Sequence, residues 1–152
     1  MSLESVRAEL HARAPDIKVV ETVESSATVE LAAIAHRVEP AQIAKTICLA
    51  VADRVLLVVA SGTARLDNRK IKDVFGGKGR MLGAEQVLAL TSHPVGGVCP
   101  FGLPTPFPIY CDASLRRFAE VVPAAGSTNA AIRIAPERLA ALTNATWVDV
   151  CQ

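Results

Sequence analysis

The chain has 152 residues, of which 51% are hydrophobic and 20% charged, and sixteen Lys and Arg against fifteen Asp and Glu give a net charge of +1. This length is typical of one domain with its own core, and the composition excludes general disorder. The near-neutral charge excludes a molecule-wide basic field for gripping nucleic acid. Aromatic residues make up 4%, so the expected core is aliphatic. We therefore treat residues 1–152 as a single domain.

The first 45 residues are expected to be mainly helical. In chain order we expect a helix over residues 3–14, a strand over 17–21, a helix over 28–35 and a short helix over 40–45. Leu3, Val6 and Leu10 repeat at the spacing of an amphipathic helix. Thr28 is of the residue type that caps helix N-termini, and Pro40 suits a first helical turn.

Two apolar runs form the expected centre of the sheet. Residues 46–51 and 55–60 are rich in β-branched and aliphatic side chains and are separated by Ala52-Asp53-Arg54, which is hairpin spacing. Because both runs are almost continuously hydrophobic, we expect a sheet that is covered on both faces.

The second half of the chain mixes short helices with short strands. We expect a helix over 67–75, a strand over 80–82, a helix over 84–90, strands over 107–111, 118–122 and 131–134, a helix over 136–142 and a closing strand over 146–150. Helices and strands do not alternate strictly. The predicted fold class is therefore α/β of mixed α+β type, with a curved, mixed, mostly antiparallel sheet surrounded by helices.

An unusually long loop over residues 91–108 separates the two halves. Loops of this length inside a compact domain are usually functional. Paired glycines, Gly96 and Gly97, allow the backbone to approach a ligand and direct its N–H groups inward, and five prolines restrict the loop's freedom. This predicts a preformed pocket wall that offers donors to a carbonyl or an oxyanion. The alternative is a rigid connector without a ligand.

Several short motifs occur in one order along the chain. They are Ile43-Ala44-Lys45-Thr46-Ile47, Ser61-Gly62, Arg65-Leu66-Asp67, Gly96-Gly97-Val98-Cys99-Pro100-Phe101-Gly102, Asp112, Ala125-Gly126 and Pro136. Together they resemble the YbaK / prolyl-tRNA synthetase-associated editing-domain family, from about Thr28 to Val150. The resemblance implies the fold of that family. It also implies hydrolysis of mischarged aminoacyl-tRNA, often tRNA(Pro), without a metal or cofactor.

The resemblance also assigns roles to residues. The family's conserved lysine and its GxxxP loop correspond to Lys45 and to Gly96, Gly97 and Pro100, which we take as the catalytic candidates. Candidate substrate-binding residues are Thr46, Gly62, His93, Val98, Cys99, Phe101, Gly102, Asp112 and Gly126. Two departures from the family pattern bear on side-chain selectivity: Ser92 in place of glycine, and Cys99 in place of proline or serine. Ala124 replaces a serine found in some members, so a role for that hydroxyl is not expected here.

Some candidates have more than one interpretation. Cys99 lies six residues from His93, which raises the alternative of a thiol-dependent hydrolase. His93 lines the pocket or caps a turn, and Asp112 orients the loop or starts a helical turn. Lys45 contacts the tRNA end or stabilises negative charge, unless it is an ordinary solvated lysine.

Basic residues are concentrated between Arg65 and Arg80. Six Lys and Arg against two Asp in this segment give +4 within a chain of +1. We take Arg65, Arg69, Lys70 and Lys72 as candidate contacts to tRNA phosphates. The alternative is a solvated helix face.

No secretory signal or membrane-length apolar run is visible, and four cysteines without CxxC spacing do not predict a zinc site. The sequence thus predicts a cytoplasmic, free-standing editing hydrolase that acts on a small amino acid carried by tRNA, with prolyl-tRNA synthetase as a candidate partner. A non-catalytic module that binds tRNA or a nucleotide in the same cleft is the alternative.

Overall fold

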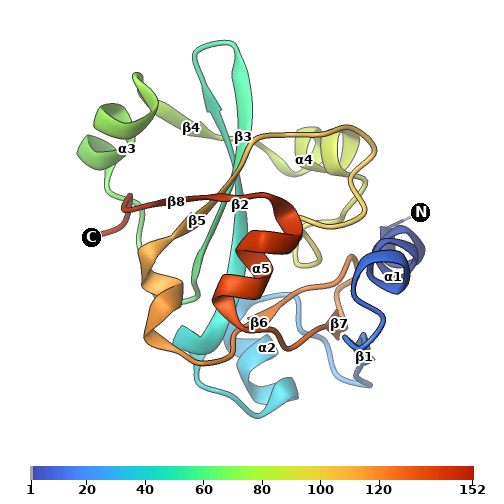
Figure 1. Ribbon diagram of the computed structural model, residues 1–152. Helices are drawn as coiled ribbons and strands as arrows, with labels where there is room; N and C mark the ends of the chain where they lie inside the picture. Colours follow the sequence, from blue (N-terminus) through green and yellow to red (C-terminus); the bar gives the residue numbers. More distant parts are fainter. Residues whose placement is uncertain (1) are drawn as a thin grey trace.

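The computed structural model describes residues 2–152 (Figure 1). Its centre is the hairpin of β2 (Ile43–Val51) and β3 (Arg54–Ser61), paired antiparallel from Ala44↔Ser61 to Val51↔Arg54. Ala52 adopts a positive φ of 55° and closes the turn with Asp53. The predicted hairpin is confirmed, although β2 begins earlier than expected.

The main sheet has the strand order β4-β2-β3-β5-β8, and β6 pairs with the first two residues of β2. The added strands are β4 (Gly79–Met81), β5 (Ile109–Asp112), β6 (Val122–Pro123) and β8 (Thr146–Val148). β4 runs antiparallel to β2, whereas the β6, β5 and β8 pairings are parallel. A separate antiparallel pair is formed by β1 (Val20–Glu21) and β7 (Ala130–Ala131). The predicted mixed sheet is confirmed.

Helices cover the sheet on both faces. The helices are α1 (Ser2–Arg13), α2 (Val29–His36), α3 (Asn68–Phe75), α4 (Ala84–Thr91) and α5 (Pro136–Thr143), with 3-10 helices at Pro40–Gln42 and Ala113–Arg117. Figure 1 shows α5 in front of the sheet, with α3 and α4 on opposite sides of the β2–β3 hairpin. Two helix starts follow from local chemistry, because the side chains of Thr28 and Asp67 accept hydrogen bonds from backbone N–H groups of α2 and α3.

Alternation along β3 divides the core between the two faces. Leu56 and Val58 pack with Ile71 and Phe75 of α3, while Val59 packs in the larger cluster with α1 and α5. The side chains of all these β3 residues are at most 1% exposed. The expectation of a sheet covered on both faces is therefore confirmed.

Several predicted elements are wrong in extent. The short helix expected over 40–45 is a 3-10 turn that ends at Gln42, so Lys45 lies inside β2 instead of before it. The strands expected over 118–122 and 131–134 shrink to Val122–Pro123 and Ala130–Ala131, and that over 17–21 shrinks to Val20–Glu21. These pieces are apolar but irregular, so partner strands and not their own periodicity decide how much of them pairs.

Candidate functional site

A cavity of about 300 Å³ lies along the outer edge of β2, the edge away from β3. Four parts of the chain enclose it: residues 26–32, the middle of β2, the segment from β4 to the loop after α4, and residues 122–131. The lining residues are Ser26, Ala27, Thr28, Val29, Ala32, Ile43, Ala44, Lys45, Thr46, Ile47, Cys48, Met81, Leu82, Val87, Val95, Gly96, Val98, Val122, Ala124, Ala130 and Ala131. Most of them are small and aliphatic, so the cavity suits a small apolar group.

Two glycines fix the wall that the long loop contributes. Gly96 has a φ of +92°, and a Cβ there would lie 2.8 Å from the carbonyl oxygen of Ala27. A Cβ on Gly97 would lie 2.8 Å from the backbone nitrogen of Ser127, and the Gly97 carbonyl accepts a hydrogen bond of 2.9 Å from the N–H of Gly126. The loop backbone therefore touches both flanking segments directly, which requires residues without side chains.

Lys45 is half-buried on β2, and its ammonium is held by main-chain oxygens. Nζ donates to the carbonyls of Gly62 at 3.2 Å and Ala64 at 2.5 Å. An ammonium has three N–H donors, so one stays free for a ligand. Burial lowers the pKa of Lys45 from its ordinary value of 10.5. The site thus places a partly desolvated cation beside an apolar cavity.

The lining of the cavity includes no Asp, Glu or His, so it offers no carboxylate or imidazole as a general base. Within residues 2–152, no group of three or more His, Cys, Asp or Glu is placed to hold a metal ion. No helix in that same range is both long and apolar enough to cross a membrane.

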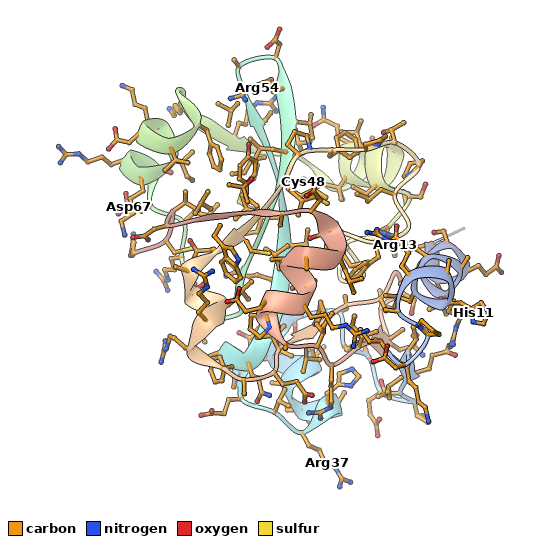
Figure 2. The ribbon with its side chains drawn as sticks, in the orientation of Figure 1. His11, Arg13, Arg37, Cys48, Arg54 and Asp67 are labelled. Atoms are coloured by element: carbon orange, nitrogen blue, oxygen red, sulfur yellow. The ribbon has the colours of Figure 1, made fainter. Side chains whose placement is uncertain are left out.

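Four of the residues predicted from the sequence line the cavity together: Lys45, Thr46, Gly96 and Val98. Cys48 lines it too, on the same side of β2 as Thr46, and lies inside the molecule (Figure 2). Gly97 follows Gly96 directly in the loop, and Pro100 is buried; neither residue is part of the lining.

A second group of predicted residues belongs to the loop but is buried outside the lining of the cavity. His93 is fully buried, with Nδ1 2.6 Å from Ser2 Oγ and Nε2 2.6 Å from the carbonyl oxygen of Phe101. Cys99 Sγ lies 3.5 Å from Nε2. Burial raises the pKa of the Cys99 thiol to about 12 and lowers that of His93. A buried thiol with this pKa does not supply a thiolate nucleophile at neutral pH.

The remaining predicted glycines serve close packing. Gly102 lies against Ser5 and Val6 of α1, and its φ is +62°. Gly126 has a φ of +94°, and a Cβ there would lie 2.7 Å from the carbonyl oxygen of Ser2. Gly62 packs against the backbone of Pro40. These residues hold α1 and the turn after β3 in contact with the segments that build the site.

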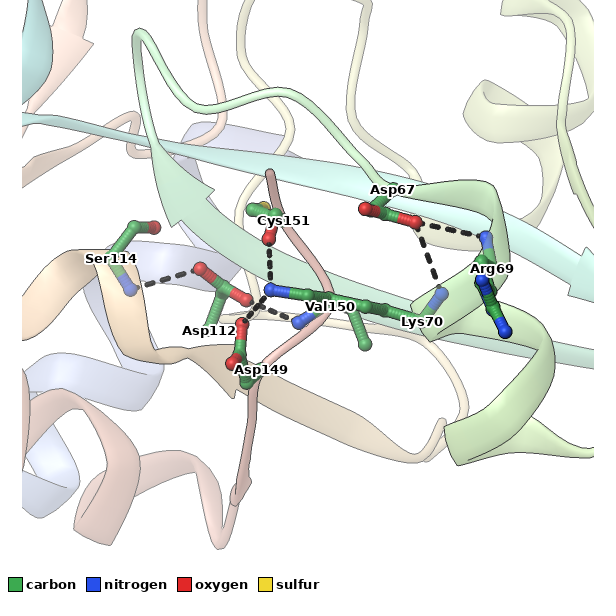
Figure 3. A network of polar contacts seen from close by, with 8 residues as sticks. All are labelled: Asp67, Arg69, Lys70, Asp112, Ser114, Asp149, Val150 and Cys151. Atoms are coloured by element: carbon green, nitrogen blue, oxygen red, sulfur yellow. Dashed lines mark hydrogen bonds and ion pairs between the residues drawn. The ribbon is translucent and has the colours of Figure 1, made fainter.

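Asp112 and Lys70 belong to a polar network in another part of the molecule (Figure 3). Asp112 accepts hydrogen bonds from the backbone N–H groups of Val150 at 2.8 Å and Ser114 at 2.9 Å. Burial raises the pKa of Asp112, but these hydrogen bonds outweigh that effect and hold it below its usual value. Lys70 donates to Asp149 at 3.0 Å and to the carbonyl of Cys151 at 2.8 Å. The network ties the C-terminal segment to β5 and α3.

The other basic candidates, Arg65, Arg69 and Lys72, are exposed on α3 and the segment before it. Sequence reasoning missed the lining contributed by residues 26–32 and by the α4 region. The cap at Thr28 marked the start of α2, but nothing local showed that Ala27 meets Gly96 or that Val29 and Ala32 line the cavity.

Comparisons with known proteins decide the family. The family model described as the aminoacyl-tRNA editing domain matches residues 23–142, which is most of the chain. The chain belongs to the aminoacyl-tRNA editing-domain family. This confirms the resemblance to the YbaK family drawn from the motifs. It also supports the general assignment of the protein as a deacylase.

Two curated relatives of this editing-domain protein come from bacteria. The Bacillus subtilis (strain 168) protein YwhH is 44% identical over 154 residues, covering 100% of this chain and 98% of that protein; its function is uncharacterized. EbsC of Enterococcus faecalis (strain ATCC 700802 / V583), named as a candidate Cys-tRNA(Pro)/Cys-tRNA(Cys) deacylase, is 28% identical over 96 residues, covering 62% of this chain and 58% of EbsC.

Two solved structures share the fold over almost the whole chain. A candidate trans-editing enzyme for prolyl-tRNA synthetase is 36% identical with a TM-score of 0.91, covering 99% of this chain and 96% of that one. The hypothetical protein APE2540 is 30% identical with a TM-score of 0.90, covering 97% and 99%. The fold predicted from the motifs is thereby confirmed.

Proposed function

We propose that this editing-domain protein hydrolyses the ester bond of tRNA(Pro) mischarged with a small amino acid. The observation that carries the proposal is the position of Lys45. Lys45 lines an apolar cavity of about 300 Å³ and keeps one N–H donor free, in a chain of the aminoacyl-tRNA editing family. The names of two relatives, a candidate Cys-tRNA(Pro) deacylase and a candidate trans-editing enzyme for prolyl-tRNA synthetase, support tRNA(Pro) as the carrier.

An aminoacyl ester is an activated substrate, so a modest catalyst suffices. The loop backbone at Gly96 and Val98, which line the cavity, supplies N–H groups for the oxyanion that forms when the ester carbonyl is attacked. The N–H of Gly97 already donates to the carbonyl of Pro94 at 2.8 Å. Lys45 positions the terminal adenosine through its free N–H. Because no acidic or imidazole side chain lines the cavity, the attacking water or substrate hydroxyl transfers its proton to solvent or to the substrate itself.

Selection by the cavity rests on size. Binding alone separates methylene-sized differences by about 10- to 200-fold, which is why synthetases use a second site for editing. An apolar cavity with short side chains accepts small amino acids and excludes those that do not fit. The exposed Arg65, Arg69 and Lys72, together with Lys70, are the proposed contacts to the tRNA backbone, and their contribution is salt-sensitive.

The decisive experiment measures deacylation of Ala-, Ser-, Cys- and Pro-tRNA(Pro) by the wild type, Lys45→Ala and Lys45→Arg. We expect the wild type to accelerate hydrolysis of at least one mischarged tRNA and to spare Pro-tRNA(Pro), and Lys45→Ala to lose most of this acceleration. If no mischarged tRNA is hydrolysed above the spontaneous rate while tRNA still binds, the protein is a binding module and the proposal is wrong.

A further inference from the structure

The outer edge of β2 is interrupted where it borders the cavity. On this edge β6 pairs with Ile43 and Ala44, and β4 pairs with Leu49 to Val51. Within residues 2–152 no strand pairs with residues 45–48 on this side, and Ala44 to Cys48 line the cavity. The gap in the sheet and the cavity are therefore the same place.

The pairing with β3 shows which residue faces the gap. The carbonyl of Ile43 accepts from the N–H of Gly62 at 2.7 Å, so the odd-numbered residues of β2 direct their backbone groups to β3. Cys48, by contrast, accepts on the outer edge, from the N–H of Leu82 at 3.3 Å. Because the direction alternates along an antiparallel strand, Thr46 directs both its N–H and its C=O outward into the gap.

The side chain of Thr46 adds a separate observation. Its Oγ1 is buried and has no hydrogen-bond partner among the described residues. Buried polar atoms are normally paired, and one without a partner calls for an explanation. Ser26 and Thr28, the other hydroxyls of the lining, already bond to Thr128 and Leu31. Thr46 therefore concentrates three unpaired polar groups in a wall that is mostly apolar.

A donor and an acceptor on one residue of a strand edge bind a partner that offers an acceptor and a donor at the same spacing. An aminoacyl ester is such a partner, because its carbonyl oxygen and its α-ammonium are separated as in a residue of a strand. Building on the proposed deacylase function, we propose that the aminoacyl group of the substrate pairs with Thr46 as a single added strand residue. The N–H of Thr46 donates to the ester carbonyl, and its C=O accepts from the α-ammonium.

This pairing defines the substrate class by the carbonyl and the α-ammonium of the aminoacyl group. Every α-amino acid offers the same two groups, so the edge recognises an esterified amino acid with a free amino group, whatever its side chain. The surrounding aliphatic residues then select by size. An acyl group without the α-ammonium loses one charge-assisted hydrogen bond in a site that excludes water, where such bonds are strong.

The test compares alanyl-, lactyl- and propionyl-tRNA(Pro), with each enzymatic rate divided by the spontaneous rate of the same ester. We expect the acceleration to fall at least tenfold from alanyl to propionyl, with lactyl between them. Equal acceleration of alanyl and propionyl esters overturns the pairing and leaves the deacylase function standing. If none of a full set of aminoacyl esters is accelerated, the deacylase function itself fails.

Two further measurements distinguish binding by the main chain of Thr46 from binding by its side-chain hydroxyl. Thr46→Val removes the hydroxyl and keeps the main chain, so the alanyl-to-propionyl ratio should persist; its collapse would assign the ammonium to Oγ1 instead. Amide hydrogen exchange with the non-hydrolysable 3′-alanylamido-adenosine should slow at Thr46 and stay unchanged at Ile47, whose N–H faces β3. Unchanged exchange at Thr46 overturns the proposal whatever the activity.

Discussion

Gly96 offers the sharpest test of how the loop shapes the cavity. In Gly96→Ala the new Cβ lies 2.8 Å from the carbonyl oxygen and 2.9 Å from Cα and Cβ of Ala27. All three atoms belong to or adjoin the backbone, so no flexible side chain can move aside. The φ of +92° is also one that L residues rarely adopt. The substitution thus combines backbone strain with overlap.

The two costs can be separated within this chain. Overpacking costs about 1–3 kcal/mol and an unfavourable positive φ about 1–2 kcal/mol, so we expect Gly96→Ala to lower the free energy of unfolding by about 2–5 kcal/mol. Gly76 has a φ of +80° with nothing within 4 Å of its Cβ position, so Gly76→Ala bears the strain alone, about 1–2 kcal/mol. Gly83, with open space and no positive φ, should tolerate alanine with little change.

The assay is denaturant unfolding of the three variants, with deacylation measured in parallel at a temperature where all are folded. Gly96→Ala should unfold most easily and lose activity, because relief of the overlap moves residues 26–28 away from the loop. Gly76→Ala and Gly83→Ala should keep wild-type activity. If Gly96→Ala is as stable as Gly76→Ala and fully active, the contact between the loop and Ala27 does not define the cavity.

Three other outcomes follow from burial. Desolvation lowers the pKa values of His36 and His93 from 6.5, so the unfolded chain binds protons more readily than the folded one. The free energy of unfolding should therefore fall as the pH drops below 6.5. The double variant His36→Gln/His93→Gln should show a flatter dependence of this free energy on pH. Cys99→Ala should keep the deacylation rate within about twofold of the wild type, since the thiol is buried outside the cavity. Its free energy of unfolding, measured with denaturant, should fall by about 1 kcal/mol. Loss of activity in a folded Cys99→Ala protein would restore the thiol mechanism. Ala124→Leu narrows the cavity and should depress kcat/KM for the larger of two accepted amino acids first; equal depression would contradict size selection.

The sequence predicted those parts of the fold that interactions between residues close in the chain determine. The β2–β3 hairpin followed from two apolar runs, and the cap predicted at Thr28 begins α2. The helix expected over 67–75 is α3, which the side chain of Asp67 caps. The two-residue strands β6 and β7 could not be bounded in the same way, because their length depends on contacts with β2 and β1. For Asp112 the sequence left two interpretations open, orienting the loop or starting a helical turn; in the structure its side chain caps the 3-10 helix at Ala113–Arg117, which agrees with the second.

The candidate site likewise contains residues that sequence motifs identify and residues that only tertiary packing brings to the cavity. Lys45, Thr46, Gly96 and Val98 belong to motifs and lie together at the cavity. His93, by contrast, differs from a ligand-binding residue only by its burial, which the sequence does not show. The lining from α2 and α4 is made of ordinary Ala, Val and Leu residues, whose orientation is a consequence of tertiary packing.

The same packing explains why one loop can be both a ligand surface and a rigid one. From below, α1 contacts the loop through Ser2 at His93 and through Ser5, whose hydroxyl donates to the Gly102 carbonyl at 3.1 Å. From the side, Gly96 meets Ala27 and Gly97 meets Ser127 without intervening side chains. Where Gly96 and Gly97 meet the main chain of Ala27 and Ser127, the wall cannot widen by a rotamer change, so its width is set by the fold. Discrimination by size requires a rigid cavity, because a wall that moved by the width of one methylene group would admit the larger of two similar amino acids as well.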